Sequence, residues 1–263
     1  MSLAMSTAVA SPKRPDYGID APPVIRNLFL LAGAALIAGL VFHFLDLSAA
    51  FYIPLREIAV VMGLNFLLNA GCMLWYSKVG KLQRREQFLD QIPWRGDEAV
   101  LDVGCGRGLL LNAAARRLKS GKAIGVDLWQ KEDLSGNRPE ATLENARLEG
   151  VADRVEVKDG DARKLPFADG SFDVVISGLA LHNIYAREER NQALREIARV
   201  LKPGGHVAIV DIDHTAEYER LLRESGVTEV KRVPSGPLAT WLVILGTWGG
   251  VRPYRVIGHK PAA

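Results

Sequence analysis

Residues 99–108 read Ala-Val-Leu-Asp-Val-Gly-Cys-Gly-Arg-Gly, a short apolar run that passes directly into three alternating glycines. The run 99–103 predicts a buried β-strand, because it is short, rich in apolar residues and bounded by a glycine turn. Gly104, Gly106 and Gly108 allow the backbone to turn sharply and to approach a bound molecule, because glycine has no Cβ that could clash. This strand and turn predict the start of an α/β domain.

Short apolar runs alternate with helical patterns through the rest of the chain. Strand and helix alternation of this kind builds a mostly parallel sheet that is covered by helices on both faces. We therefore expect residues 84–263 to form a Rossmann-like, doubly wound α/β fold with seven strands. The predicted strands are 99–103, 122–126, 155–157, 172–177, 206–212, 228–233 and 254–259, and the predicted helices are 109–118, 139–149, 187–201 and 215–225.

Acidic residues stand at the ends of the first three predicted strands, where ligands of such sheets bind. Asp102 precedes the glycine turn, and its carboxylate suits a cationic amino group or a sulfonium better than a phosphate. A dinucleotide-binding turn has Gly-x-Gly-x-x-Gly, and the third glycine here comes one residue early. Asp127 could accept hydrogen bonds from ribose hydroxyls, and Asp161 from an adenine amino group. Alternatively, Asp127 is a solvated strand end and Asp161 a turn residue.

The region from residue 100 to residue 213 resembles the class I S-adenosylmethionine-dependent methyltransferases. It is most similar to the bacterial small-molecule branch that includes ubiquinone and menaquinone methyltransferases. The resemblance implies that S-adenosylmethionine is the cofactor and that the chain is an enzyme. The segments that carry it are 100–108, 125–127, 160–162, 165–167, 171–175 and 196–205.

The same resemblance implies a set of cofactor-binding residues. The glycine loop would lie under the methionine part of the cofactor, with Asp127 at the ribose. Asp161 and Ala162 would lie at the adenine, and Ser177 near the sulfonium. The complete set is Asp102, Gly104, Cys105, Gly106, Gly108, Asp127, Leu128, Asp161, Ala162 and Ser177.

A general base is needed only if the methyl acceptor carries a proton that must leave, as a phenol or a thiol does. His182 follows the fourth predicted strand and is the best candidate, because imidazole titrates near neutral pH. The alternative is an ordinary polar residue that caps the next element. Tyr185, Asp211 and His214 are weaker candidates, and no cluster of residues indicates a metal site.

The N-terminal third of the chain has a different character. Residues 1–23 are small, polar and proline-containing, which predicts a disordered tail. Residues 24–83 hold two apolar runs, 28–45 and 58–76, and each is close to the roughly 20 residues that span a bilayer as a helix. We expect a transmembrane hairpin, through which the protein could also form oligomers. A soluble cap or a dimer interface is the alternative; a cleaved signal peptide fits poorly, because a second apolar run follows.

Basic residues flank both runs, and the link between them carries only Arg56 as a cation. This distribution predicts that both ends face the cytoplasm, at a bacterial-type inner membrane. Asn65 and Asn69 lie four residues apart and could hydrogen-bond to a neighbouring helix. The flanking cations are Lys13, Arg14, Arg26, Lys78, Lys81, Arg84 and Arg85.

Several functional alternatives remain open at this level. The net charge of +3 does not favour a nucleic-acid partner. A membrane location favours a small lipophilic acceptor, such as a quinone, a lipid, a phenol or a thiol. A non-catalytic cofactor-binding membrane subunit or sensor is the main alternative, and a dinucleotide oxidoreductase is a third. Residues 128–138 could form a lid over the cofactor, and residues 234–253 a substrate lid, a membrane-dipping element or a buried strand.

Overall fold

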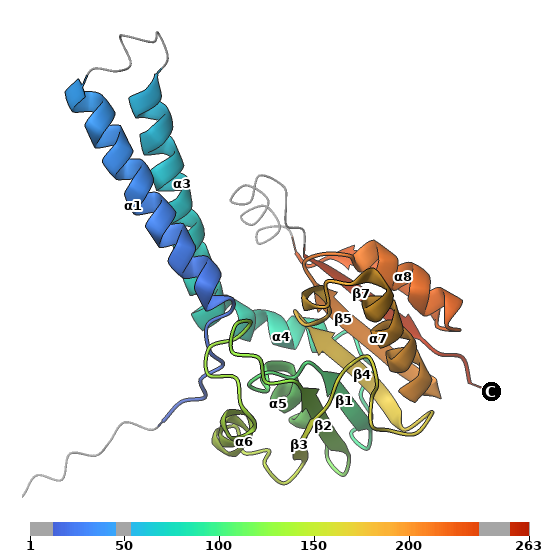
Figure 1. The fold of residues 1–263 in the computed structure, drawn as a ribbon. Coiled ribbons are helices and arrows are strands. Elements are labelled where there is room, and N and C mark those ends of the chain that lie inside the picture. Colours follow the sequence, from blue (N-terminus) through green and yellow to red (C-terminus); the bar gives the residue numbers. More distant parts are fainter. Residues whose placement is uncertain (1–12, 46–53, 237–252, 263) are drawn as a thin grey trace, which may run out of the picture.

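The computed structural model describes residues 13–45, 54–236 and 253–262. A helical hairpin stands on one side of an α/β domain, and a bent helix connects the two (Figure 1). Residues 234–253 were predicted to form a substrate lid, a membrane-dipping element or a buried strand. Residues 237–252 of this segment lie outside the described residues.

The domain is built on one seven-stranded sheet, with strand order β3-β2-β1-β4-β5-β7-β6. The first five strands run parallel, and β7 runs antiparallel to both of its neighbours. This confirms the predicted mostly parallel sheet. The strands are β1 Ala99–Val103, β2 Lys122–Asp127, β3 Val155–Asp159, β4 Phe172–Gly178, β5 Leu201–Asp211, β6 Thr228–Pro234 and β7 Tyr254–His259.

Helices cover both faces of the sheet, as expected for a doubly wound fold. Successive residues of a strand point to opposite faces, so Val100 belongs to a core cluster with side chains of α4 and α5, while Leu101 belongs to a second cluster with side chains of α7 and α8. Both side chains are fully buried. The helices of the domain are α4 Lys81–Leu89, α5 Leu109–Ala115, α6 Pro139–Leu148, α7 Arg187–Val200 and α8 Thr215–Glu224, with a 3₁₀ turn at Leu181–Asn183.

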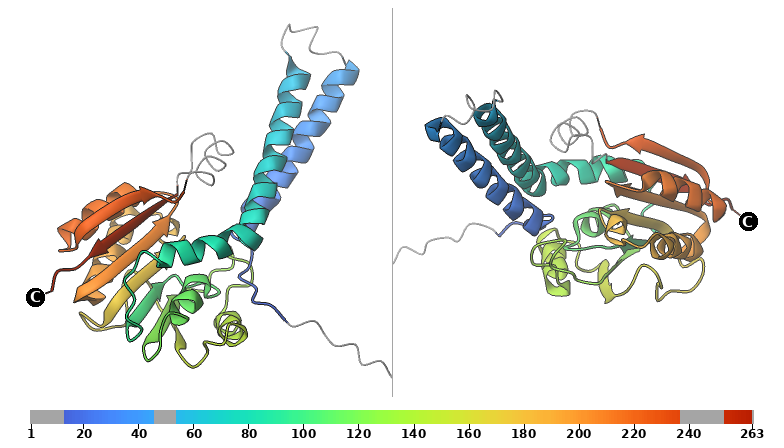
Figure 2. Two further views of the ribbon diagram at one scale, coloured as in Figure 1. Left: turned by 180° about the vertical axis from the view of Figure 1, so that it is seen from behind. Right: turned by 45° about the horizontal axis from the view of Figure 1, so that its top comes forward.

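The order of the strands fixes where the ligand site lies. The chain winds outward from β1 through β2 to β3 and then returns to place β4 on the other side of β1. Ligands of such sheets bind at this reversal, at the carboxyl ends of the strands. These ends point toward the side of the domain from which the hairpin projects (Figures 1 and 2).

The hairpin consists of α1 Pro22–Leu45 and α3 Leu55–Trp75, which lie side by side (Figure 1). Small residues allow the close approach. A Cβ on Gly39 would lie 2.9 Å from Val60 Cγ2, and one on Gly63 would lie 2.7 Å from Leu36 Cγ. Small residues at helix interfaces are typical of membrane helices, because they let the backbones approach.

Asn65 and Asn69 do not bridge the two helices. The side-chain amide of Asn69 donates to the backbone oxygen of Asn65 at 2.8 Å and to its side-chain oxygen at 3.1 Å. The expectation of a bond across to the neighbouring helix is therefore wrong within this chain, because the four-residue spacing already satisfies the amide within α3.

A π-helical turn, η1 Tyr76–Gly80, joins α3 directly to α4. Such turns mark bends in helices and are frequent at functional sites. The helical path therefore continues from the hairpin into the α/β domain, and Ser77 and Lys81 on it are buried.

Residues 13–21 belong to the folded structure. This corrects the predicted disordered tail over the part of it that the structure describes. Tyr17 is 5% exposed, and its hydroxyl donates to Glu149 Oε1 at 2.6 Å. Asp20 forms a β-bridge with Leu134. Low apolar content suggested disorder, but this segment is held by polar contacts that local composition does not reveal. The helix that follows starts at Pro22, before the predicted apolar run.

Candidate functional site

The glycine loop follows β1 and has the backbone conformation that its glycines allow. Gly104, Gly106 and Gly108 have φ angles of +74°, +52° and +83°, in the region that side chains disfavour. A Cβ on Gly104 would lie 2.2 Å from Ala180 Cβ. The loop therefore needs glycine both for its conformation and for the contact with the segment after β4.

Asp102 lies below this loop and is 1% exposed. Burial, together with the nearby charge of Asp127, raises the pKa of Asp102 to about 8. Its Oδ1 atom accepts no hydrogen bond from the described residues. A buried carboxyl group with a free oxygen is suited to a cationic ligand, because the cation would favour the charged form.

Asp127, at the end of β2, joins the glycine loop to the loop that follows. It accepts hydrogen bonds from Gly106 N at 2.8 Å, Trp129 N at 2.6 Å and Asn137 Nδ2 at 3.1 Å. A carboxylate offers about four acceptor positions, so it could also accept from a ligand hydroxyl. The sequence singled out Asp127 but did not show that residues 129–137 fold back onto it.

Residues 129–137, within the segment predicted to form a lid over the cofactor, lie against the glycine loop. A Cβ on Gly106 would lie 2.8 Å from Leu134 Cδ2. Trp129 has a φ of +59°, which is unusual for a residue with a side chain and is often found near functional sites. We call residues 129–137 the lid loop. Leu128, just before it, is 54% exposed at the same edge of the sheet.

Asp161 lies in a turn and pairs with Arg163. Its carboxylate accepts hydrogen bonds from the backbone N and the Nε of Arg163, each at 2.9 Å. These bonds and the charge of Arg163 lower the pKa of Asp161 despite the partial burial that opposes them. The structure thus places Asp161 in a turn closed by Arg163, and Ala162 beside it packs on the hydrophobic core.

Ser177 and Cys105 contribute to the framework of the site in this structure. The Ser177 hydroxyl is buried and donates to Val103 O at 2.7 Å, so it fixes the end of β1 to β4. Cys105 is buried against Gly125 of β2, and burial raises the pKa of its thiol. Only the backbone of Cys105 is therefore suited to contact a ligand.

The segment after β4 brings Leu179 and Ala180 to the site, and no sequence pattern predicts a role for either residue. Leu179 has a φ of +54°, again a strained conformation at the carboxyl edge. Ala180 follows it and contacts Gly104. No local pattern marks these residues, because their role depends on β4 lying next to β1.

His182 forms a hydrogen-bonded dyad with Asp211, at the end of β5. The distance from His182 Nδ1 to Asp211 Oδ1 is 2.5 Å, and the backbone N of His182 donates to Asp211 Oδ2 at 3.1 Å. Asp211 is fully buried and also accepts from the Tyr218 hydroxyl at 3.2 Å. Burial and the charge of Asp211 raise the pKa of Tyr218, which keeps this hydroxyl protonated as a donor.

The electrostatics of the dyad suit a general base. Burial lowers the pKa of His182, but the hydrogen bond and charge of Asp211 outweigh it, aided by Asp133 and Asp213, and the net shift is upward. An Nδ1–H bond to Asp211 leaves Nε2 as the acceptor of a proton.

The site therefore combines four parts: the glycine loop, the buried carboxyl group of Asp102, the carboxylate of Asp127 at the end of β2, and the His182–Asp211 pair. The first three fit an amino-acid-bearing nucleoside, with Asp102 for a cationic group and Asp127 for hydroxyls. The fourth could remove a proton from a second molecule. Among the described residues, no group of three or more His, Cys, Asp and Glu side chains could hold a metal ion.

Comparison with known proteins agrees with this geometry. Residues 101–209 match the family described as "Methyltransferase domain". Methyltransferase GfsG of Streptomyces halstedii is 38% identical over 127 residues, which cover 48% of this chain and 42% of that protein. Demethylmenaquinone methyltransferase of Symbiobacterium thermophilum is 34% identical over 180 residues, which cover 66% of this chain and 65% of that protein. The chain thus spans less than two thirds of either relative.

Solved structures share the fold. The crystal structure of geranyl diphosphate C-methyltransferase from Streptomyces coelicolor, in complex with Mg²⁺, geranyl diphosphate and S-adenosyl-L-homocysteine, has a TM-score of 0.53. It is 17% identical and covers 68% of this chain and 78% of that one. Fold and family match agree: residues 101–209 match a methyltransferase domain, and the sheet with its helices has the Rossmann-like fold of solved methyltransferases.

Proposed function

We propose that this protein transfers the methyl group of S-adenosylmethionine to a small lipophilic acceptor at a membrane surface, and that the acceptor is a hydroquinone. The observation that carries this proposal is the apolar hairpin, which projects from the side of the domain that holds the carboxyl ends of the strands (Figure 1). A hydrophobic molecule in the bilayer would therefore meet the catalytic face of the domain.

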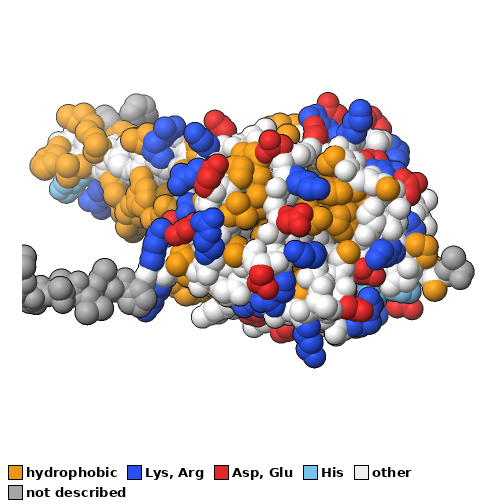
Figure 3. Space-filling view, turned by 90° about the horizontal axis from the view of Figure 1, so that it is seen from below, with side chains coloured by type: hydrophobic (Ala, Val, Ile, Leu, Met, Phe, Trp, Pro, Cys, Tyr) orange, Lys and Arg blue, Asp and Glu red, His pale blue; other side chains and the backbone are white. Residues whose placement is uncertain are grey.

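The hairpin has the length and composition of a membrane-spanning pair. Helix Pro22–Leu45 has 24 residues, and its most apolar 18-residue window has a mean hydropathy of 2.4. The helical stretch Leu55–Leu89 has 35 residues, and its most apolar window has a mean hydropathy of 1.8. Only 11% and 17% of their most apolar windows are buried, whereas the core helix of a soluble protein is mostly buried. Hydrophobic side chains cover much of the visible hairpin surface (Figure 3). Exposed apolar surface of this extent indicates an interaction with lipid or another protein.

Basic residues near the base of the hairpin support the proposed orientation. Arg26 and Lys78 are exposed there, and basic side chains gather where the hairpin meets the domain (Figure 3). Cations next to a span favour the cytoplasmic side. We therefore place the domain on the cytoplasmic side of a bacterial-type inner membrane.

The acceptor class follows from combining the membrane location with the relatives. One relative is named for methylating a demethylmenaquinone, which is a lipophilic quinone. A quinone in its reduced form carries phenolic hydroxyl groups, and removal of one proton makes oxygen and ring carbon nucleophilic. The His182–Asp211 dyad is suited to that step.

The residues of this chain would have separate roles in binding the cofactor and in removing a proton from the acceptor. When bound, S-adenosylmethionine supplies a methyl group on a sulfonium, already activated for displacement. Gly104 and Gly106 cradle the ligand, and Asp102 and Asp127 orient it through charge and hydrogen bonds. His182 Nε2 takes the hydroxyl proton of the acceptor, and Asp211 stabilises the resulting imidazolium. We assign no direct contact to Ser177, whose hydroxyl is engaged by Val103.

Asp102 predicts a specific pH dependence of cofactor binding. Its pKa of about 8 means that it is mainly protonated at neutral pH, and a cationic ligand binds the deprotonated form better. Affinity for S-adenosylmethionine should therefore rise between about pH 6 and about pH 7.5. Isothermal titration calorimetry would measure this slope. In Asp102→Asn the slope should flatten and the affinity should fall; an unchanged slope would exclude Asp102 as the titrating group.

The acceptor is tested with the full chain in lipid nanodiscs. Reduced demethylated quinones with long and short side chains are compared with water-soluble phenols and thiols, and formation of S-adenosylhomocysteine is followed. We expect turnover with the long-chain hydroquinone. Turnover only with a soluble thiol or phenol would overturn the acceptor class. Cofactor binding without turnover on any acceptor would favour the sensor alternative.

The membrane location predicts the effect of charges on the outward face of the hairpin. Ile37 and Leu64 are 64% and 56% exposed, so aspartate at both positions would not disturb the contact between the helices. In a bilayer each charge costs about 2.5–3.5 kcal/mol, and the variant should leave the membrane fraction after carbonate washing. Membrane retention of the variant, or a soluble wild-type chain, would contradict the proposal.

A further inference from the structure

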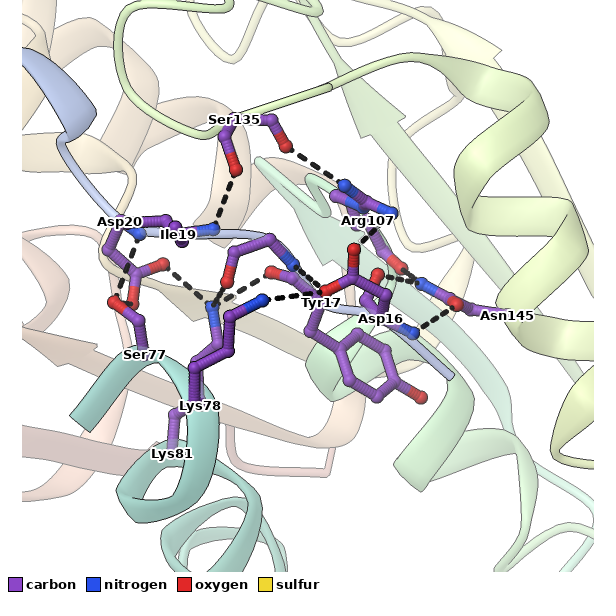
Figure 4. Close-up of polar contacts among 11 residues, drawn as sticks. Asp16, Tyr17, Ile19, Asp20, Ser77, Lys78, Lys81, Arg107, Ser135 and Asn145 are labelled. Carbon is purple, nitrogen blue, oxygen red and sulfur yellow. Dashed lines mark hydrogen bonds and ion pairs between the residues drawn. The ribbon is translucent and has the colours of Figure 1, made fainter. Parts of the chain in front are cut away.

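A short segment, residues 16–21, connects the base of the hairpin to the methyltransferase site (Figure 4). We call it the strap. It precedes α1 and runs between the bent helix η1–α4 on one side and the lid loop on the other. Both sides are fixed by hydrogen bonds.

On the helix side, Lys81 is the main anchor. Its ammonium group donates to Tyr17 O at 2.8 Å, Gly18 O at 3.1 Å and Asp20 Oδ1 at 2.9 Å. The Lys81 side chain is only 4% exposed. Ser77, one turn earlier, donates to Asp20 Oδ2 at 3.0 Å and accepts from Asp20 N at 3.1 Å. Buried charges need such partners, so the ammonium group and the strap depend on each other.

On the other side, the strap pairs with the lid loop in an antiparallel fashion. Ile19 N donates to Ser135 Oγ at 2.7 Å, Ser135 N donates to Ile19 O at 3.0 Å, and Ala21 N donates to Asp133 O at 2.8 Å. These bonds hold residues 133–135 of the lid loop beside the strap, with Leu134 against Gly106 of the glycine loop.

Arg107 of the glycine loop ties the strap and the lid loop together. Its guanidinium group pairs with Asp16 Oδ2 at 3.2 Å and donates to Ser135 O at 3.0 Å. Asn145 of α6 donates both to Asp16 O at 2.8 Å and to Arg107 O at 3.0 Å. The strap is therefore continuous, through hydrogen bonds, with the loop that follows β1.

The lid loop in turn contacts the residues that carry the proposed chemistry. Trp129 N and Asn137 Nδ2 donate hydrogen bonds to Asp127. Leu134 lies against Gly106. The charge of Asp133 contributes to the raised pKa of His182. A displacement of the strap would therefore loosen the lid loop at three places around the cofactor site.

We infer that Lys81 is a positioning residue for the cofactor: it holds the strap, and through the strap it holds the lid loop over the glycine loop. The inference rests on the proposed function, because the ligand covered by the lid loop is S-adenosylmethionine. The junction between the hairpin and the α/β domain is thereby part of the cofactor site, although Lys81 itself contacts no residue assigned to the ligand.

The test is Lys81→Met in the full chain, in nanodiscs. Methionine keeps much of the apolar stem and removes the ammonium group, so the carbonyl oxygens of Tyr17 and Gly18 lose their shared donor. The dissociation constant for S-adenosylmethionine, measured by calorimetry, should rise at least about tenfold, which corresponds to 1.4 kcal/mol. The KM for the cofactor should rise in parallel, while kcat at saturating cofactor should change much less, because the lid loop can still close over a bound ligand.

Lys78→Met is the matched control. Lys78 lies on the same helical turn, is exposed and contacts the strap only through Asp16 at 3.4 Å. Exposed pairs of this kind contribute little, so cofactor affinity should stay close to that of the wild type. Equal affinities for wild type and Lys81→Met, with both folded by circular dichroism, would overturn the inference.

Ser135→Ala tests the same connection from the lid side and serves if Lys81→Met does not fold. It removes the acceptor of Ile19 N and should also weaken cofactor binding. If both residues act through the strap, the two substitutions together should cost less than the sum of their separate effects. Full additivity, or no effect of Ser135→Ala, would overturn the inference. Failure of the wild-type chain to bind S-adenosylmethionine would instead overturn the proposed function.

Discussion

Replacement of His182 by alanine should lower turnover about 100- to 10,000-fold, the usual contribution of a general base, and should leave cofactor affinity nearly unchanged. The reason is that the imidazole pairs with Asp211, with Nδ1 2.5 Å from Oδ1, whereas the proposed contacts to the cofactor come from Asp102, Asp127 and the glycine loop. Single-turnover formation of S-adenosylhomocysteine with a reduced quinone would measure the effect.

His214→Ala is the matched control for this substitution. His214 follows β5, three residues after Asp211. It is partly exposed, and its Nε2 lies 3.5 Å from Asp213 Oδ2. Its removal should change turnover little. Normal turnover of His182→Ala would show that the acceptor needs no base from this residue.

The pH profile gives a second measure of the dyad. A base must be neutral to accept a proton, and the pKa of His182 is raised above its ordinary 6.5. The rate should therefore rise with pH through a pKa above that value. In Asp211→Asn the charge that raises the pKa is lost, so this limb should move to lower pH. The maximal rate should also fall, because asparagine no longer holds the Nδ1–H form of the ring.

Replacement of Gly104 by valine should abolish measurable cofactor binding. Its backbone has a φ of +74°, and a Cβ would lie 2.2 Å from Ala180 Cβ, far closer than two carbons can approach. The loop after β1 and the segment after β4 would have to separate, which moves both walls of the site. Calorimetric titration with S-adenosylmethionine would show the loss, and circular dichroism would show whether the sheet remains folded.

Gly150→Val separates the steric effect from the backbone strain. Gly150 has a φ of +70°, but a Cβ on this residue would have no neighbour within 4 Å. The strain is similar, about 1–2 kcal/mol, and the neighbours are not displaced. Gly150→Val should lose some stability and still bind the cofactor. Equal loss of binding in both variants would mean that strain alone, and not the Ala180 contact, decides the result.

Much of the fold was predictable because parallel strands covered on both faces must be nearly continuous apolar runs. The predicted strand 254–259 agrees with β7, and the helix predicted to begin at residue 139 does so. The fifth strand was predicted from residue 206 but begins at Leu201, where it pairs with Phe172 across a bulge. Apolar pattern could not indicate that start, because Pro203 and Gly204 interrupt it.

Individual site residues were predictable to different degrees. The glycine loop and Asp127 occupy the expected edge because strand ends define that edge in every sheet of this kind. Asp161 instead closes a turn with Arg163, two residues away, and Ser177 is buried against Val103. Their predicted contacts with the cofactor stay untested, and the partners they have here come from neighbours that a strand-end pattern does not specify.

The sequence alone determined the α/β class, the glycine turn and the two long apolar helices, because each depends on the conformational freedom or the periodicity of neighbouring residues. Only the tertiary structure decided that Asp211 supports His182, that residues 16–21 hold the lid loop, and that Lys81 joins them to the hairpin. These contacts link residues 29 to 116 positions apart. They exist because the strand order and the bent helix bring distant segments together, and hydrogen bonds among buried polar groups then select one arrangement.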